Sequence, residues 1–201
     1  METKERILLA ALELAAQKGL GSVSMTQIAE KAGMKKPSLY NHFESREEII
    51  REMYSFLRER SKQQLSLTSI NYGEFVKDKS AFQALSEALT GYMAMTSQNE
   101  MLTFYKVIYS QRTVDAAAAQ IMREETERMI LETKNLFYAL QAHDKLFLQD
   151  ADMAATSFAM TVHAIMDYLH DCENSGAAVP KEMLTNYIRW FCEHNGGVDY
   201  E

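Results

Sequence analysis

The chain has 201 residues, of which 47% are hydrophobic and 24% charged, and its formal net charge is −7. These ordinary fractions exclude wholesale disorder and a fibrous repeat, and the length allows one large or two small domains with their own cores. Two cysteines are too few for a disulfide scaffold and are typical of a reducing cytosol. Only eight glycines and two prolines interrupt the chain, which predicts long helices.

The charge is unevenly distributed. Residues 1–62 contain 11 Lys and Arg against 9 Asp and Glu, or +2, which leaves 10 against 19, or −9, for residues 63–201. Only the first third could therefore comfortably face a polyanion. No apolar run approaches the roughly 18–20 residues that span a bilayer. We therefore expect a cytoplasmic protein that neither enters nor binds a membrane.

The first two predicted helices are short and have clear ends. Apolar residues recur at helical spacing over Ile7–Ala15, and Gly19 follows where a C-terminal cap adopts the left-handed conformation. Ser24 and Gln27 have the spacing of a capping box, which starts a second helix that ends at Gly33.

The third and fourth helices follow at once. Pro37 suits the first turn of a helix, and Leu39 with Phe43 gives that helix one apolar stripe. Ser45–Glu48 forms a second capping box and starts a longer helix at about residues 45–65.

The rest of the chain predicts five further helices, which brings the total to about nine. Residues 66–79 are expected to be a hinge or linker, and a third capping box at Ser80 and Gln83 follows. The predicted helices lie at about 80–93, 101–108, 114–143, 152–174 and 180–195, the last two as an antiparallel hairpin.

The segment from about 24 to 43 matches the architecture of a helix-turn-helix, because two short helices flank a turn that contains Gly33. A short helix can enter a DNA major groove only if its other side is held by apolar contacts, which Leu39 and Phe43 provide. Its outer face offers hydrogen-bonding groups on Ser38, Tyr40 and Asn41. From these residues alone, an ordinary surface helix with polar side chains remains an alternative.

The same residues resemble the tetracycline-repressor (TetR) family. The specific signatures are IA-x-x-AG at residues 28–33 and LY-x-HF at residues 39–43, and the resemblance covers about the first 55 residues. It implies an all-α, one-component transcription regulator with an N-terminal three-helix DNA-binding domain (residues 1–50) and a helical effector-binding and dimerisation domain (residues 51–201), connected by the helix at about 45–65. It also implies a homodimer formed through the last two helices.

The resemblance assigns DNA contacts to individual positions. Positions that match Thr26, Lys36, Pro37, Ser38 and Tyr40 approach bases in the family, and those that match Tyr40, His42 and Arg46 meet phosphates. Thr26 stands where some relatives have a longer Arg, which weakens the expectation of guanine readout there. Together with Asn41, the expected DNA-binding residues are Thr26, Lys36, Pro37, Ser38, Tyr40, Asn41, His42 and Arg46.

A ligand site in the acidic part would be a mostly apolar pocket with a few polar groups. Thirteen methionines suit a deformable pocket, although apolar side chains on one face of a helix more often belong to the core. The candidate ligand-binding residues are Tyr105, Tyr109, Met122, Thr126, Met129, Phe137, Met160 and His163.

Two other patterns carry weaker hypotheses. His163, Asp167 and His170 share one helix face, but a fourth ligand is not evident, so we predict no metal and no other cofactor. Cys172 and Cys192 would lie some 18 Å apart along the hairpin, far beyond the roughly 7 Å limit for a disulfide.

The predicted final hairpin is more apolar than one hairpin can bury, so a second copy is expected to cover the excess in a four-helix bundle. Trp190 is a candidate interface anchor or a core residue. The expected dimer residues are Phe158, Val162, Ile165, Leu169, Leu184, Tyr187, Ile188, Trp190 and Phe191.

Together these observations predict a DNA-binding repressor that a small, largely apolar effector releases from a palindromic operator. The alternative is a TetR-like adaptor or activator that acts through a protein partner without a small molecule. An enzyme is not expected, because the chain has no nucleophile elbow, phosphate loop or metal-ligand motif.

Overall fold

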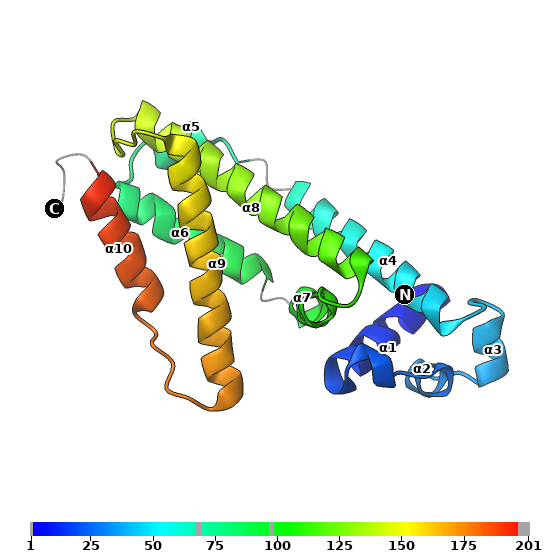
Figure 1. The fold of residues 1–201 in the computed structure, drawn as a ribbon. Coiled ribbons are helices and arrows are strands. Elements are labelled where there is room, and N and C mark those ends of the chain that lie inside the picture. The colour runs from blue at the N-terminus through cyan, green and yellow to red at the C-terminus, as the bar shows by residue number, and fades with distance from the viewer. Residues whose placement is uncertain (1, 67–69, 97–98, 197–201) are drawn as a thin grey trace. The chain divides into compact units, whose positions relative to one another are not determined.

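The computed structural model describes residues 2–66, 70–96 and 99–196, which fold almost entirely into helices (Figure 1). The all-α class expected from the sequence is confirmed. A 3₁₀ helix, η1 (Leu20–Ser22), follows the first α-helix. The α-helices are α1 (Thr3–Lys18), α2 (Met25–Lys31), α3 (Lys36–Tyr40), α4 (Arg46–Ser66), α5 (Tyr72–Val76), α6 (Ala81–Thr96), α7 (Asn99–Gln111), α8 (Ala116–Ala142), α9 (Ala151–Ser175) and α10 (Met183–Asn195).

The described residues thus form ten α-helices where the sequence predicts about nine. The additional helix is α5, which lies in the segment expected to be a linker. Asn71 caps it, because the Asn71 side chain accepts a hydrogen bond from the Glu74 backbone N–H, and Val76 buries its apolar side chain. Residues 67–69 of the expected linker lie outside the described residues.

The chain divides into two compact units, which we describe separately. Unit 1 comprises Met1–Ser69 and Met95–Glu124, and unit 2 comprises Ile70–Ala94 and Glu125–Glu201. Unit 1 therefore joins α1 to α4 with α7 and the beginning of α8, and unit 2 contains α5, α6, the rest of α8, α9 and α10.

The two short helices of unit 1 begin and end where their local chemistry requires. Ser24 and Gln27 form both hydrogen bonds of the predicted capping box at the start of α2. At the end of α2, Gly33 has φ 67°, its N–H donates to Glu30 O, and the Met34 N–H donates to Ala29 O. This pair of bonds is a Schellman motif, which ends α2 and turns the chain toward α3.

The core of unit 1 holds α3 from its apolar side. Leu39 and Phe43 are buried together with residues of α1, α2, α4 and α7. Pro37 lies in the first turn of α3 as predicted. Ser45 accepts a hydrogen bond from the Glu48 N–H, so one half of the second capping box forms, whereas the Glu48 carboxylate accepts from the Glu44 N–H instead of closing the box.

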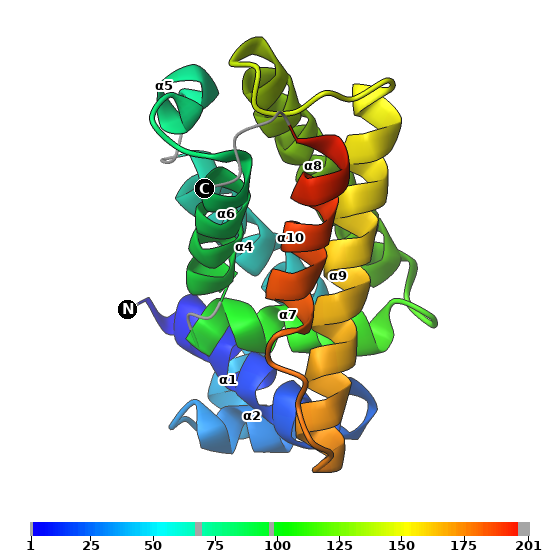
Figure 2. The ribbon, with the colours of Figure 1, turned by 90° about the vertical axis from the view of Figure 1, so that its left-hand side faces the viewer.

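The core of unit 2 is an aromatic cluster. Phe137 of α8 packs against Phe158 of α9 and Phe191 of α10, with ring centroids 5.4 and 5.3 Å apart. The capping box at Ser80 forms both of its bonds to Gln83 and starts α6. The last two helices run antiparallel and side by side, as predicted (Figures 1 and 2).

One lysine that follows α8 forms hydrogen bonds with the end of α5. Lys145 Nζ donates hydrogen bonds to the carbonyl oxygens of Val76, Lys77 and Lys79. Carbonyl groups at the end of a helix lack backbone partners, so a cation there both satisfies them and opposes the helix dipole. None of the described helices has the length and apolarity that crossing a membrane requires.

Candidate DNA-binding surface

The residues expected to contact DNA lie on α2, on α3 and at the start of α4. Thr26 faces solvent near the start of α2, and α3 exposes Lys36, Pro37, Ser38 and Tyr40 while burying Leu39 completely. Helix α3 therefore presents a polar and aromatic face with its apolar side held in the core. This is the arrangement that a helix needs to enter a major groove.

The remaining expected contacts lie in the turn after α3. Asn41 is exposed and His42 is half-buried, and the His42 N–H donates to the Leu39 carbonyl. Tyr40, 48% exposed, is the large side chain on this surface. The surface combines two lysines, Lys35 and Lys36, with hydroxyl and amide groups, so it can approach phosphates and read base edges.

Arg46 is engaged differently from the other expected contacts. Its Nε donates to Val23 O at 2.6 Å, one terminal nitrogen donates to Leu20 O, and the other lies 3.2 Å from a carboxylate oxygen of Glu47. Sequence reasoning missed these bonds, because nothing in the spacing of residues 20–46 marks two carbonyl groups as its partners.

A model of the family described as "Bacterial regulatory proteins, tetR family" matches residues 7–53. Residues 7–53 are therefore a tetR-family domain. The matched residues include α2, α3 and the beginning of α4, which carry the surface described above. This domain supports a DNA-binding regulatory role for the protein.

Solved structures share the fold over nearly the whole chain. A TetR-family transcriptional regulator from Marinobacter aquaeolei VT8 is 18% identical, with 100% of this chain and 94% of that chain covered and a TM-score of 0.66. Salmonella enterica GusR is 20% identical, with 95% of each chain covered and a TM-score of 0.62. A candidate transcriptional regulator from Saccharomonospora viridis, in complex with choline, is 18% identical, with 96% and 97% covered and a TM-score of 0.65. At these identities the likeness concerns the fold.

The expected ligand-binding residues fall in both units of the chain. In unit 1, Tyr105 and Met122 pack against the core, and Tyr109 is exposed with the Arg112 guanidinium 3.5 Å from its ring centroid. The Tyr105 hydroxyl lies 2.8 Å from the hydroxyl of Ser61, which is buried on α4. Sequence analysis overlooked Ser61, although a serine on the apolar face of α4 was a usable signal.

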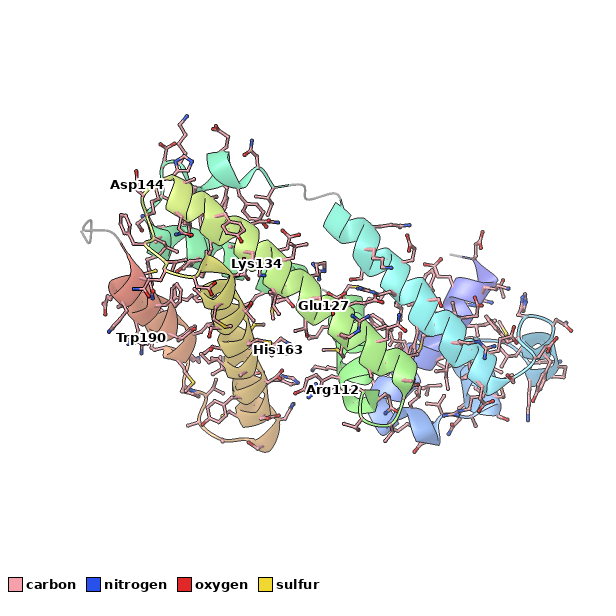
Figure 3. The ribbon with its side chains drawn as sticks, turned by 45° about the horizontal axis from the view of Figure 1, so that its top comes forward. Arg112, Glu127, Lys134, Asp144, His163 and Trp190 are labelled. Atoms are coloured by element: carbon pink, nitrogen blue, oxygen red, sulfur yellow. The ribbon has the colours of Figure 1, made fainter. Side chains whose placement is uncertain are left out.

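In unit 2 the expected ligand-binding residues do not share one environment. Thr126 and Met129 are half-buried on α8, whereas Phe137 is fully buried in the aromatic core. Met160 is exposed on α9, and His163 Nδ1 lies 3.7 Å from Asp167 Oδ2 on the same helix (Figure 3).

The histidines of α9 are paired with carboxylates at distances typical of surface ion pairs. Besides the His163–Asp167 pair, His170 Nδ1 lies 3.6 Å from Glu173 Oε2. Within the described ranges, no three His, Cys, Asp or Glu side chains are grouped so as to hold a metal ion. Both cysteines are free thiols and buried, and burial raises the pKa of Cys192 to about 12.

The residues expected at a dimer interface separate into three groups by burial. Ile165 and Tyr187 pack partly buried against the core of unit 2, and Leu169 is half-buried on α9. Trp190 is 51% exposed on α10 (Figure 3). The others belong to this chain's own core, namely Phe158, Val162, Leu184, Ile188 and Phe191.

Two tyrosines next to acidic side chains have strongly shifted pKa values. Tyr54 is buried on α4, and this burial, with a smaller contribution from the charge of Asp115, raises its pKa to about 12. Burial also raises the pKa of Tyr72, whose hydroxyl donates to a Glu132 carboxylate oxygen at 2.6 Å. Both phenols are therefore neutral at physiological pH.

Proposed function

We propose that the protein represses transcription by binding a near-palindromic operator as a homodimer, and that a small, largely apolar effector releases it. The observation that carries this proposal is the amphipathic α3, with Leu39 buried and Ser38 and Tyr40 exposed. In a two-fold dimer, the two α3 helices would enter successive major grooves about 34–36 Å apart, so the operator would share the two-fold symmetry.

The experiment is selection of duplexes from a random pool with the full-length protein, followed by gel-shift titration of the recovered DNA. A near-palindrome should emerge, and Tyr40→Ala should abolish its binding while the oligomeric state in sedimentation is unchanged. Recovery of an asymmetric site, or full affinity of Tyr40→Ala, would contradict the assignment. A reporter gene placed behind the recovered site separates repression from activation, since repression lowers its expression.

The dimer is proposed to form through exposed apolar side chains of α9 and α10. Met160 and Tyr168 are exposed on α9, and Met183 and Trp190 are exposed on α10. Aromatic anchors of this kind dominate interface energies. Trp190→Ala should weaken the dimer by about 2 kcal/mol or more, or about thirtyfold in dissociation constant, in sedimentation equilibrium. Phe147→Ala, an equally exposed aromatic outside these helices, is the control and should have no effect.

The effector is proposed to bind in unit 1, beside the half-buried residues Tyr105 of α7 and Met122 at the beginning of α8. The choline complex of the Saccharomonospora viridis protein supports a small molecule as the class of effector in this fold. Choline chloride and a panel of apolar compounds should be tested by calorimetry and by release of the operator. If none of them binds while a partner protein alters operator affinity, the adaptor function replaces the effector.

A further inference from the structure

Arg46 joins two parts of the DNA-binding region that are far apart in the sequence. It is the first residue of α4, and its guanidinium group reaches back to the carbonyl oxygens of Leu20 and Val23. Leu20 is the first residue of η1, and Val23 ends η1 and immediately precedes Ser24, which caps α2. One side chain thus connects the start of α4 with the start of α2.

The bonds explain why a cation is tolerated at this position. The beginning of a helix carries partial positive charge, so a guanidinium at the first residue of α4 is unfavourable unless its charge is compensated. Here two carbonyl oxygens accept from it, and the carboxylate of Glu47 lies beside it. Hydrogen bonds from an ionised donor are stronger than neutral ones, and the Arg46 side chain is only 26% exposed.

The two acceptors require the geometry of arginine. Leu20 and Val23 are buried residues, and their carbonyls accept from different nitrogens of one planar group. A lysine ammonium is a compact point charge and does not reproduce this fork. A phosphate, in contrast, can be neutralised by either cation.

We infer that Arg46 is a positioning residue that fixes the start of α2 through the Leu20 and Val23 carbonyls, instead of acting as a phosphate contact. The inference rests on the proposed DNA-binding function only where it predicts a change in operator affinity. Because α2 packs against α3, displacement of the start of α2 changes the orientation of the recognition helix. Operator affinity then depends on Arg46 without the electrostatic signature of a phosphate contact.

Salt dependence separates the two roles. Each phosphate contact contributes about 0.9 to the slope of log K against log salt concentration on duplex DNA. We expect Arg46→Lys and Arg46→Gln to weaken binding of the selected operator duplex about tenfold or more, with the wild-type slope between about 50 and 200 mM salt. Lys36→Gln is the matched control, because Lys36 is an exposed lysine that can approach a phosphate, and the slope of this variant should fall by about 0.9. Wild-type affinity of Arg46→Lys, or a reduced slope of Arg46→Gln, would overturn the inference.

A second measurement needs no DNA. Amide hydrogen exchange over residues 24–31 of the free, full-length protein should be faster in both Arg46 variants than in the wild type, and unchanged exchange would contradict the positioning role. If a variant does not fold, the Arg46 Nε–H signal in nitrogen-15 NMR of the wild-type protein distinguishes the positioning role from a phosphate contact. It should be protected from exchange in the free protein and unshifted by DNA, whereas a rapidly exchanging or strongly shifted signal argues for a phosphate contact. Failure to select any duplex would refute the proposed function while leaving this test valid.

Discussion

Truncation of Leu39 tests how much its buried side chain contributes to holding α3 in place. Helix α3 has five residues, far fewer than the 12–15 that an isolated helix needs for marginal stability in water, so its persistence depends on tertiary contacts. Leu39 is 0% exposed and lies in the core of unit 1. Leu39→Ala removes three carbon atoms, worth about 2.4 kcal/mol at about 0.8 kcal/mol each, and the remaining cavity adds up to about 2 kcal/mol.

We therefore expect Leu39→Ala to lower the free energy of unfolding by about 2.5–4.5 kcal/mol in urea titration. Exchange of the α3 amides should also become faster. Tyr40→Ala is the matched control, because it truncates the neighbouring residue of the same helix on its exposed side. It should change stability by less than about 0.5 kcal/mol while removing operator binding. A loss below about 1 kcal/mol for Leu39→Ala would refute the view that α3 is held by its buried side.

Three further predictions follow from contacts elsewhere. Ser24→Ala should cost about 1 kcal/mol of unfolding free energy, because it removes the cap of α2, whereas Ser22→Ala should be nearly neutral; equal effects would argue against the cap. The raised pKa of Tyr54 means that folding favours its protonated form, so stability should be constant below pH 10 and fall as the pH rises toward 12. Tyr54→Phe should flatten this decline, and an unchanged pH profile would contradict it. Cys172 and Cys192 are buried, so a thiol reagent should label the native protein slowly and the urea-unfolded protein rapidly at neutral pH; rapid native labelling would show that the hairpin opens.

The local signals in the sequence predicted the first four helices well. The capping box at Ser24, the glycine at position 33 and the proline at position 37 act through their immediate neighbours, so their effects can be read without knowing the fold. The same reasoning missed α5, although Asn71 caps this helix in the same local way. The contact that no local pattern could reveal is the one with Lys145, which is about 70 residues away in the sequence.

The site residues were predictable to different degrees for the same reason. Exposure of Ser38 and Tyr40 follows from their positions about 100° to either side of Leu39 on α3. The partners of Arg46 could not be predicted, because hydrogen bonds to backbone carbonyls leave no mark on the residues that supply them. Helical periodicity also cannot distinguish an apolar face that meets a second chain from one that meets its own core. Phe158 and Phe191, expected at a dimer interface, lie in the core of unit 2.

The choice of residue at position 33 is limited by chirality and not by the space around it. A Cβ atom added there would meet no heavy atom within 4 Å, yet φ is +67°, which L-residues rarely adopt. A D-amino acid favours this half of the backbone map and loses less conformational freedom than glycine on folding. Semisynthetic protein with D-alanine at position 33 should therefore be more stable than the natural chain, and L-alanine there should be less stable. The turn between α2 and α3 is thus a place where stability can be adjusted through handedness alone, without changing any side chain of the candidate DNA-binding surface.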